Sequence, residues 1–193
     1  MSTVNSVDVP LSGSTGTGNF VGTTSPTLVT PTIGAATATS VGFSPTTGGI
    51  VGTTTNDNTD AGNVGESIVS AVDTPGISLT NNTAADITSI SLTAGDWDVW
   101  GNVVLIFGAT TNCTTYGMWS SATSATVPDV TLSCNISTSV AGIVPGAITG
   151  CGNSIPPLRY SLSGTTTIYL SVKAAFSIST LAAFGVIQAR RAR

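Results

Sequence analysis

Apolar residues recur at every second position near the end of the chain, and this period constrains the fold more than any other feature. Residues 158–163 alternate apolar and polar side chains, and residues 164–165 form a Gly-Thr turn signal. The following segment places one set of apolar residues on a single face, namely Ile168, Leu170, Val172, Ala174 and Phe176. Because successive strand residues point to opposite sides of a sheet, this spacing predicts a hairpin with one buried face.

Similar alternation begins at about residue 63. Further candidate strands are residues 66–73, 86–93, 97–107, 116–120, 130–134 and 181–189. Residues 97–107 carry apolar side chains on both faces at their far end, so we expect this strand to be buried on both sides. Residues 135–157 are rich in Gly and Pro and are predicted to form a long connection. Roughly eight strands without a helical period predict an all-β fold, an antiparallel β-sandwich or jelly roll.

Residues 1–62 differ from the rest because Ser, Thr, Gly, Pro and Ala dominate them. Pro26, Pro31 and Pro45 favour extended geometry in the residue before each proline. Such a segment buries too little apolar surface to order itself, so we expect it to lie along a partner. The sequence therefore predicts an extended low-complexity tether over residues 1–62 and a β domain over residues 63–193.

Charged residues make up only 7% of the chain, against about a quarter of an ordinary soluble domain. So little charge is typical of a protein whose neighbours in an assembly cover much of its surface. The pI is near 4.2, which argues against a general nucleic-acid binder because such proteins carry a basic face. The basic residues within 190–193 are expected to be a solvated strand end or a contact with a neighbouring subunit.

Neither a membrane span nor a secretory signal is expected from the sequence. No stretch of about 20 apolar residues is present, and residues 1–6 lack the basic and apolar regions of a signal peptide. Cys113, Cys134 and Cys151 have a loose spacing that fits no zinc pattern, so we expect reduced cysteines that act as small packing residues.

The residues required for most catalytic sites are scarce. The chain contains no histidine and a single glutamate, Glu66, which excludes Ser-His-Asp and Cys-His catalysis and histidine metal sites. Asp96 and Asp98 share one strand face and are the remaining candidates for the paired carboxylates of a glycosidase. The alternative is a polar strand start after the turn at residues 94–95. We expect no enzymatic activity and no cofactor.

One segment approaches a calcium-binding pattern. Asn56, Asn58 and Asp60 alternate ahead of Gly62 and Glu66, and alternating oxygen ligands suit a hard cation. The glycine and the final carboxylate are out of register with the calcium-loop motif, however. The pattern therefore favours an Asn- and Asp-rich turn without a bound metal.

Tyr116 and Trp119 are the candidate residues for contact with a glycan, because sugar rings pack against aromatic faces. Aromatic side chains also dominate protein cores and subunit interfaces, which is the alternative for both residues. Trp97 and Trp100 lie on opposite faces of one predicted strand, so at most one of them can line any one glycan-binding surface.

Several segments resemble structural proteins of tailed-phage virions. Residues 11–40 read LSGSTGTGNFVGTTSPTLVTPTIGAATATS and resemble a linker-like segment of tail-fibre and other virion proteins. Residues 155–170, IPPLRYSLSGTTTIYL, and residues 187–193, IQARRAR, resemble the closing hairpin of small phage fibre domains. Residues 92–103, LTAGDWDVWGNV, resemble a strand of the same proteins.

This resemblance implies a tail-fibre or head-fibre type of protein, a short trimeric fibre or spike of the virion that is assembled in the bacterial cytoplasm. Residues 1–62 would anchor the homotrimer to capsid, portal or tail proteins, and the β domain would project for attachment to the host surface, with a cell-surface glycan as candidate partner. The alternative is a capsid or collar decoration protein with a stabilising role. Neither nucleic acid nor a membrane is an expected partner. The candidate anchoring residues are Phe20, Pro26, Leu28, Pro31 and Ile33.

Overall fold

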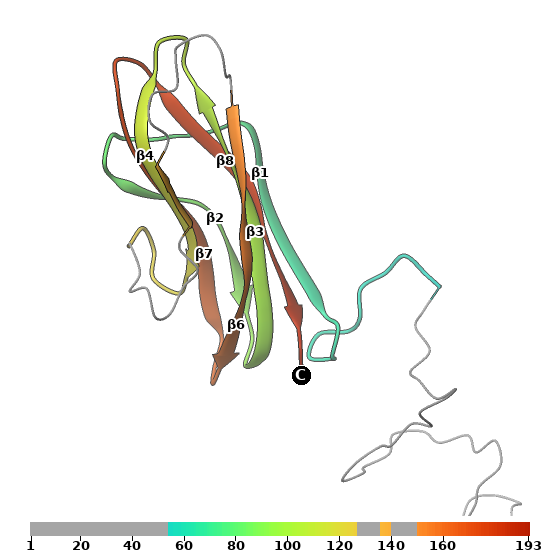
Figure 1. Cartoon of the computed structure of the whole chain (residues 1–193). Coiled ribbons are helices and arrows are strands. Elements are labelled where there is room, and N and C mark those ends of the chain that lie inside the picture. Colours follow the sequence, from blue (N-terminus) through green and yellow to red (C-terminus); the bar gives the residue numbers. More distant parts are fainter. Residues whose placement is uncertain (1–53, 127–135, 140–149) are drawn as a thin grey trace, which may run out of the picture. The chain divides into compact units, whose positions relative to one another are not determined.

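The computed structural model describes residues 54–126, 136–139 and 150–193. These residues form two β-sheets within one compact unit, Thr53–Arg193 (Figure 1). No helix occurs among them, and so none that is long and apolar enough to cross a bilayer. The predicted all-β class is confirmed. The strands are β1 (Ser67–Ser78), β2 (Ala84–Leu92), β3 (Gly95–Phe107), β4 (Asn112–Ser121), β5 (Ile136–Ser139), β6 (Gly150–Leu162), β7 (Thr166–Ser177) and β8 (Leu181–Arg191).

The strands pair as one long hairpin that is folded back on itself. β1 pairs with β8, β2 with β7, β3 with β6 and β4 with β5, always antiparallel. Further pairing of β3 with β8 and of β4 with β7 joins these hairpins side by side. The result is a first sheet of order β1-β8-β3-β6 and a second sheet of order β2-β7-β4-β5. This winding confirms the expected jelly-roll sandwich.

The hydrophobic core lies between the two sheets. Alternate residues of β3 from Trp97 to Phe107 point inward, and alternate residues of β7 from Ile168 to Ala174 point inward from the opposite sheet. Phe107 is 8% exposed and Leu170 is fully buried, as the period of two predicts. Cys113 is also buried in this core as a free thiol, and Cys151 is a free, partly buried thiol beside it.

The expectation that β3 is buried on both faces is wrong for the single chain. Its other face, from Asp98 to Ile106, consists of residues that are exposed or only partly buried. The inward face is covered by the second sheet, whereas the strands beside β3 cover only its edges. We call the face of the first sheet that points away from the second sheet its outer face.

The predicted long connection over residues 135–157 is also wrong in part. β5 pairs with β4 over residues 136–139, and β6 already begins at Gly150. Pro156 and Pro157 are tolerated because β6 is the edge strand of the first sheet, where a missing N–H breaks no interior pairing. The register of β6 against β3 shifts beside these prolines. The candidate strand at residues 130–134 lies outside the described residues.

The proposed tether also lies outside the described residues, apart from residues 54–62. The anchoring residues Phe20, Pro26, Leu28, Pro31 and Ile33 therefore stay predictions, as does the domain boundary after residue 62. Within residues 54–62, the side chain of Asn58 hydrogen bonds both backbone groups of Ser67, the first residue of β1. These residues are thus fastened to the β domain.

Leu170→Ala should lower the free energy of unfolding by about 3 kcal/mol, because it removes buried methyl groups and leaves a cavity between the sheets. Phe107→Ala should cost a similar amount. Ser91→Ala, at an exposed position of β2, is the control and should change stability by less than about 0.5 kcal/mol. Denaturant titration measures all three. A Leu170→Ala loss as small as that of the control would mean that the inward faces are misassigned.

Candidate functional site

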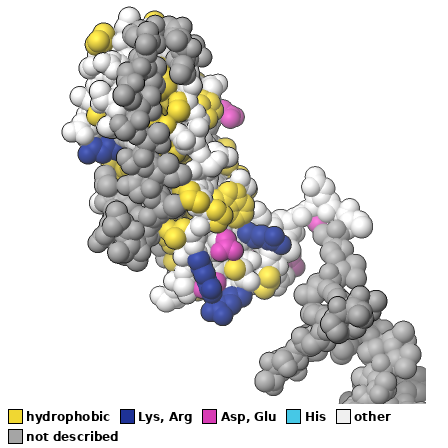
Figure 2. All heavy atoms as spheres, in the orientation of Figure 1, with side chains coloured by type: hydrophobic (Ala, Val, Ile, Leu, Met, Phe, Trp, Pro, Cys, Tyr) yellow, Lys and Arg dark blue, Asp and Glu magenta, His cyan; other side chains and the backbone are white. Residues whose placement is uncertain are grey.

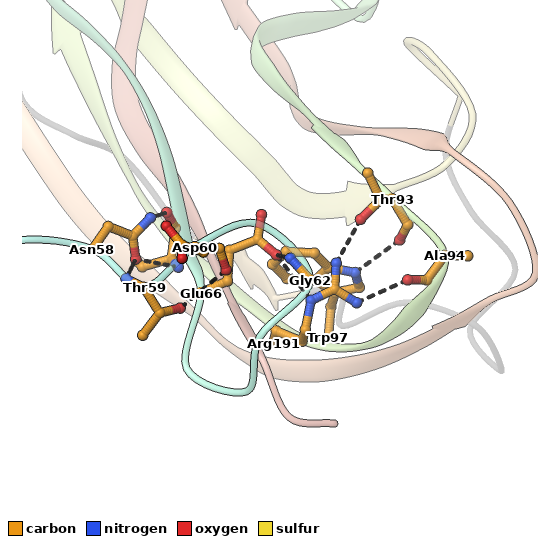
Figure 3. A network of polar contacts seen from close by, with 10 residues as sticks. Asn58, Thr59, Asp60, Gly62, Glu66, Thr93, Ala94, Trp97 and Arg191 are labelled. Carbon is orange, nitrogen blue, oxygen red and sulfur yellow. Dashed lines mark hydrogen bonds and ion pairs between the residues drawn. The ribbon is translucent and has the colours of Figure 1, made fainter. Parts of the chain in front are cut away.

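A buried ion pair closes the jelly roll where its first and last strands meet. Glu66 directly precedes β1, and Arg191 is the last residue of β8. Arg191 Nε lies 2.9 Å from Glu66 Oε2, and the two side chains are only 5% and 8% exposed. Antiparallel pairing of β1 with β8 brings these residues together across 125 positions of sequence. The two groups form the centre of the network in Figure 3.

Each nitrogen of the Arg191 guanidinium has an acceptor. Beyond the Glu66 contact, Nη1 donates to the carbonyl of Ala94 at 2.8 Å, and Nη2 donates to Thr93 Oγ1. The guanidinium carbon lies 4.3 Å from the centre of the Trp97 ring, a cation–π contact. The Trp97 indole N–H in turn donates to the carbonyl of Thr93 at 2.9 Å. A buried cation is thus fully paired, which offsets its cost of desolvation.

Gly95 leaves the room that Arg191 occupies. Its φ of +131° is unfavourable for a residue with a side chain. A Cβ at this position would also overlap Arg191 Nη1. The β2–β3 turn and the buried arginine therefore depend on the same glycine.

The network also holds the segment that leads into the domain. Glu66 Oε2 accepts a second hydrogen bond from the backbone N–H of Gly62 at 2.8 Å (Figure 3). The Gly65 N–H donates to the Arg191 carbonyl at 3.0 Å, and the Arg191 N–H donates to the Glu66 carbonyl at 2.8 Å. We call Glu66, Arg191, Trp97, Thr93 and the turn at Gly62 the clamp.

A second carboxylate at this end is shared by two arginines. Asp96 is 5% exposed, and its Oδ2 contacts Arg159 at 2.9 Å and also Arg193. The hydrogen bond from Arg193, with Ser161 and Arg159 adding to it, lowers the pKa of Asp96 far below its ordinary value. The Gly62 N–H and then Arg191 likewise lower the pKa of Glu66, against the opposing effect of burial. Both groups are held as carboxylates.

These contacts change the interpretation of the charged residues. The basic residues near the end were expected to be solvated or to contact a neighbour, yet Arg191 and Arg193 pair within the chain, whereas Arg190 is exposed. Asp96 is occupied by arginines, and Asp98 is exposed on the outer face. The calcium-like oxygens of Asn58 and Glu66 accept backbone hydrogen bonds instead. The described residues contain no group of three or more Cys, Asp or Glu side chains that could hold a metal ion.

The two aromatic residues proposed for glycan contact are buried. Tyr116 is 3% exposed, and its hydroxyl lies 3.2 Å from Cys151 Sγ and accepts from Asn153 Nδ2 at 2.6 Å. Trp119 is 1% exposed. Neither ring presents a face to a ligand in the single chain, because Tyr116 belongs to the core between the sheets and Trp119 is as deeply buried. Burial of this kind is typical of aromatic packing residues.

Comparisons with known proteins show limited similarity. No protein-family model matches the chain, and no curated protein sequence matches it. Among solved structures, infectious bursal disease virus strain Gx matches at 15% identity and a TM-score of 0.31, covering 64% of this chain. The VP2 subviral particle of that virus matches at 14% identity and a TM-score of 0.31, covering 66%. The chain spans 30% and 31% of those chains. Similarity at this level carries no argument about function.

Glu66→Gln should lower the free energy of unfolding by about 3 kcal/mol or more, because it leaves the buried Arg191 without its counter-charge. Asp73→Asn, which changes an exposed carboxylate on β1, is the matched control and should stay within about 0.5 kcal/mol. Chemical denaturation measures both. Equal stability of the two variants would show that the clamp contributes little to the fold.

The pH dependence of the free energy of unfolding is an independent test of the Glu66→Gln variant. Because the folded pKa values of Glu66 and Asp96 are lowered, their stabilisation is complete above the unfolded values, which lie at about 4. It is lost as pH falls through the folded values. Stability should therefore decline below about pH 4, and Glu66→Gln should flatten that decline.

Proposed function

We propose that this chain is a structural subunit of a tailed-phage particle, a short trimeric fibre or spike. In this proposal residues 1–62 anchor the subunit to other virion proteins, and the jelly roll projects as a head that contacts the host surface. The clamp is the observation that carries the proposal. Together with Asn58, it fastens the residues that connect the two parts to both the first and the last strand, as an appendage loaded through its N-terminal segment requires.

The low charge content supports a place in a large assembly. Buried charges in the described part of the chain are paired at the clamp end, whereas the residues of β3, β8 and β6 at the opposite end of the outer face carry no charge. There, Val104 and Ile106 of β3 lie beside Phe184 and Ala182 of β8, all only partly buried. Gly150 and Gly152 of β6 flank them on the other side without side chains. We call these residues the apolar end of the outer face.

A second copy of the chain is the occupant that we propose for the apolar end. An uncharged surface lets identical subunits approach without burying an unpaired charge, and the glycines allow close approach of a neighbouring backbone. A trimer would bury this surface against sister subunits. The same arrangement would account for apolar side chains on both faces of β3.

We also propose that the protein is not an enzyme. Of the two carboxylates considered as a glycosidase pair, Asp96 is held ionised by Arg193 and Arg159. A general acid needs a pKa raised toward neutrality, which is the opposite shift. The chain also has no histidine to act as a general base.

A capsid or collar decoration protein is the second candidate. The observation that favours it is the burial of Tyr116 and Trp119, the two residues expected to contact a receptor. In that role the head would stabilise the particle. Particles without the protein would then adsorb to host cells normally but lose their contents at a lower temperature, whereas loss of an attachment fibre would reduce adsorption.

Light scattering should give the purified full chain a mass about three times that of the monomer, as expected for a closed three-fold assembly. Ile106→Asp should shift it toward the monomer, because it places a charge in the proposed subunit contact. Ser91→Asp introduces the same charge at an exposed position of the second sheet and should leave the mass unchanged. A monomeric wild-type chain at micromolar concentration would exclude the trimer.

Deletion of residues 1–53 should leave a folded head that no longer joins particles, because it removes most of the proposed anchor, including all five candidate anchoring residues, and keeps the clamp. Copy number is measured by mass spectrometry of purified particles from a phage that lacks the intact gene. Fusion of residues 1–53 to an unrelated trimeric protein is the reciprocal test and should recruit that protein. Incorporation of the truncated head at normal copy number would move the anchoring surface into the jelly roll.

A further inference from the structure

A shallow hollow of about 310 Å³ lies on the outer face near the clamp end. Asp98 and Trp100 of β3, Arg190 of β8 and Pro157 of β6 line it. These three strands are neighbours in the first sheet, with β3 in the middle. Figure 2 shows acidic, basic and hydrophobic side chains gathered at this end of the molecule. The opposite part of the outer face is the apolar end defined above.

The polar groups of the hollow differ from the other charges nearby because they are unpaired. Asp98 and Arg190 are direct partners in the β3–β8 register. Within the described part of the chain, however, their side chains form no ion pair and no hydrogen bond with each other or with other residues. Arg191, Arg193 and Arg159, by contrast, all pair with carboxylates. An acceptor and a donor thus face one hollow with their bonding capacity free.

The apolar part of the lining comes from Trp100 and Pro157. Trp100 is partly buried, unlike the fully buried Trp97 on the other side of the same strand. Its indole N–H also makes no hydrogen bond within the described residues. A partly exposed indole held by a rigid central strand offers a flat apolar surface and a donor at little cost in side-chain entropy.

We infer that this hollow binds one uncharged saccharide unit of a surface glycan. The Asp98 carboxylate would accept from ring hydroxyls, the Arg190 guanidinium would donate to them, and Trp100 would pack against the C–H face of the sugar ring. The lining carries one negative and one positive charge, which favours a ligand without net charge. This assignment rests on the attachment role proposed above, and moves the glycan contact from Tyr116 and Trp119 to Trp100.

The chemistry disfavours an anionic ligand. A phosphate or a sulfated sugar would meet Arg190 but also the unpaired carboxylate of Asp98, and like charges at close range are costly. A zwitterionic dipeptide would satisfy both charges but would not use the flat surface of Trp100. A saccharide ring uses all of these groups, and the open shape of the hollow leaves room for the rest of a glycan chain.

The test is an array of neutral oligosaccharides built from glucose, galactose and N-acetylglucosamine, probed with the full chain. Binding should fall about tenfold or more for Trp100→Ala, with a smaller loss for Asp98→Asn and for Arg190→Gln. Thr114→Ala, at an exposed position of the second sheet, is the control and should bind as the wild type does. The bound oligosaccharides should be recovered uncleaved.

A second measurement covers the case in which Trp100→Ala fails to fold. Trp97 and Trp119 are buried, so quenching of the wild-type fluorescence by acrylamide reports mainly on Trp100. The oligosaccharide that binds on the array should protect this signal, and Asp98→Asn should reduce the protection at unchanged thermal stability. The inference is overturned if no neutral oligosaccharide binds, if Trp100 and Asp98 variants bind normally, or if a zwitterionic dipeptide protects where sugars do not.

Particle incorporation separates this inference from the proposed function. Trp100→Ala should join particles at normal copy number while host adsorption falls. Normal incorporation with unchanged adsorption would exclude the saccharide site and leave the virion role intact. A wild-type chain that is never incorporated would exclude the virion role itself.

Discussion

Antiparallel pairing between the first and the last strand is the contact on which the rest of the structure depends. β8 pairs with β1 on one side and with β3 on the other, so it joins the start of the domain to the centre of the first sheet. The Arg191–Glu66 pair lies at the end of this ladder, where it also fixes the turn at Gly62 and the β2–β3 turn. Stability of the domain and attachment of the preceding segment are therefore set by the same few side chains.

The all-β class follows from the alternation of apolar and polar residues, whereas the pairing of the strands does not. Alternation predicts most strands and the buried face that carries Leu170, because side-chain direction is a local property. Burial of β3 was overestimated because apolar residues on a second face do not say whether the same chain covers them. The connection at 135–157 was misjudged because Gly and Pro are tolerated on an edge strand such as β6, and edge position depends on the sheet order.

The sequence carries a signal for the clamp. Arg191 has the same parity in β8 as the buried Ile187 and Ala189, so it points inward, whereas Arg190 points outward. An inward arginine requires a buried partner, and Glu66 is the sole glutamate of the chain. That the two meet could not be read from the sequence, because it depends on the pairing of β1 with β8. The Asp98–Arg190 register across β3 and β8 was hidden for the same reason.

The pairing of β1 with β8 has a consequence for the order of events during synthesis. β1 leaves the ribosome early, but its partner is made only after the other strands, so the first sheet cannot close while translation of the domain continues. Domains dominated by such distant pairings fold slowly and expose unpaired strands in the meantime. A chain that ends before β8 would lack both its central ladder and Arg191. Only molecules translated through the last strand would acquire a complete jelly roll.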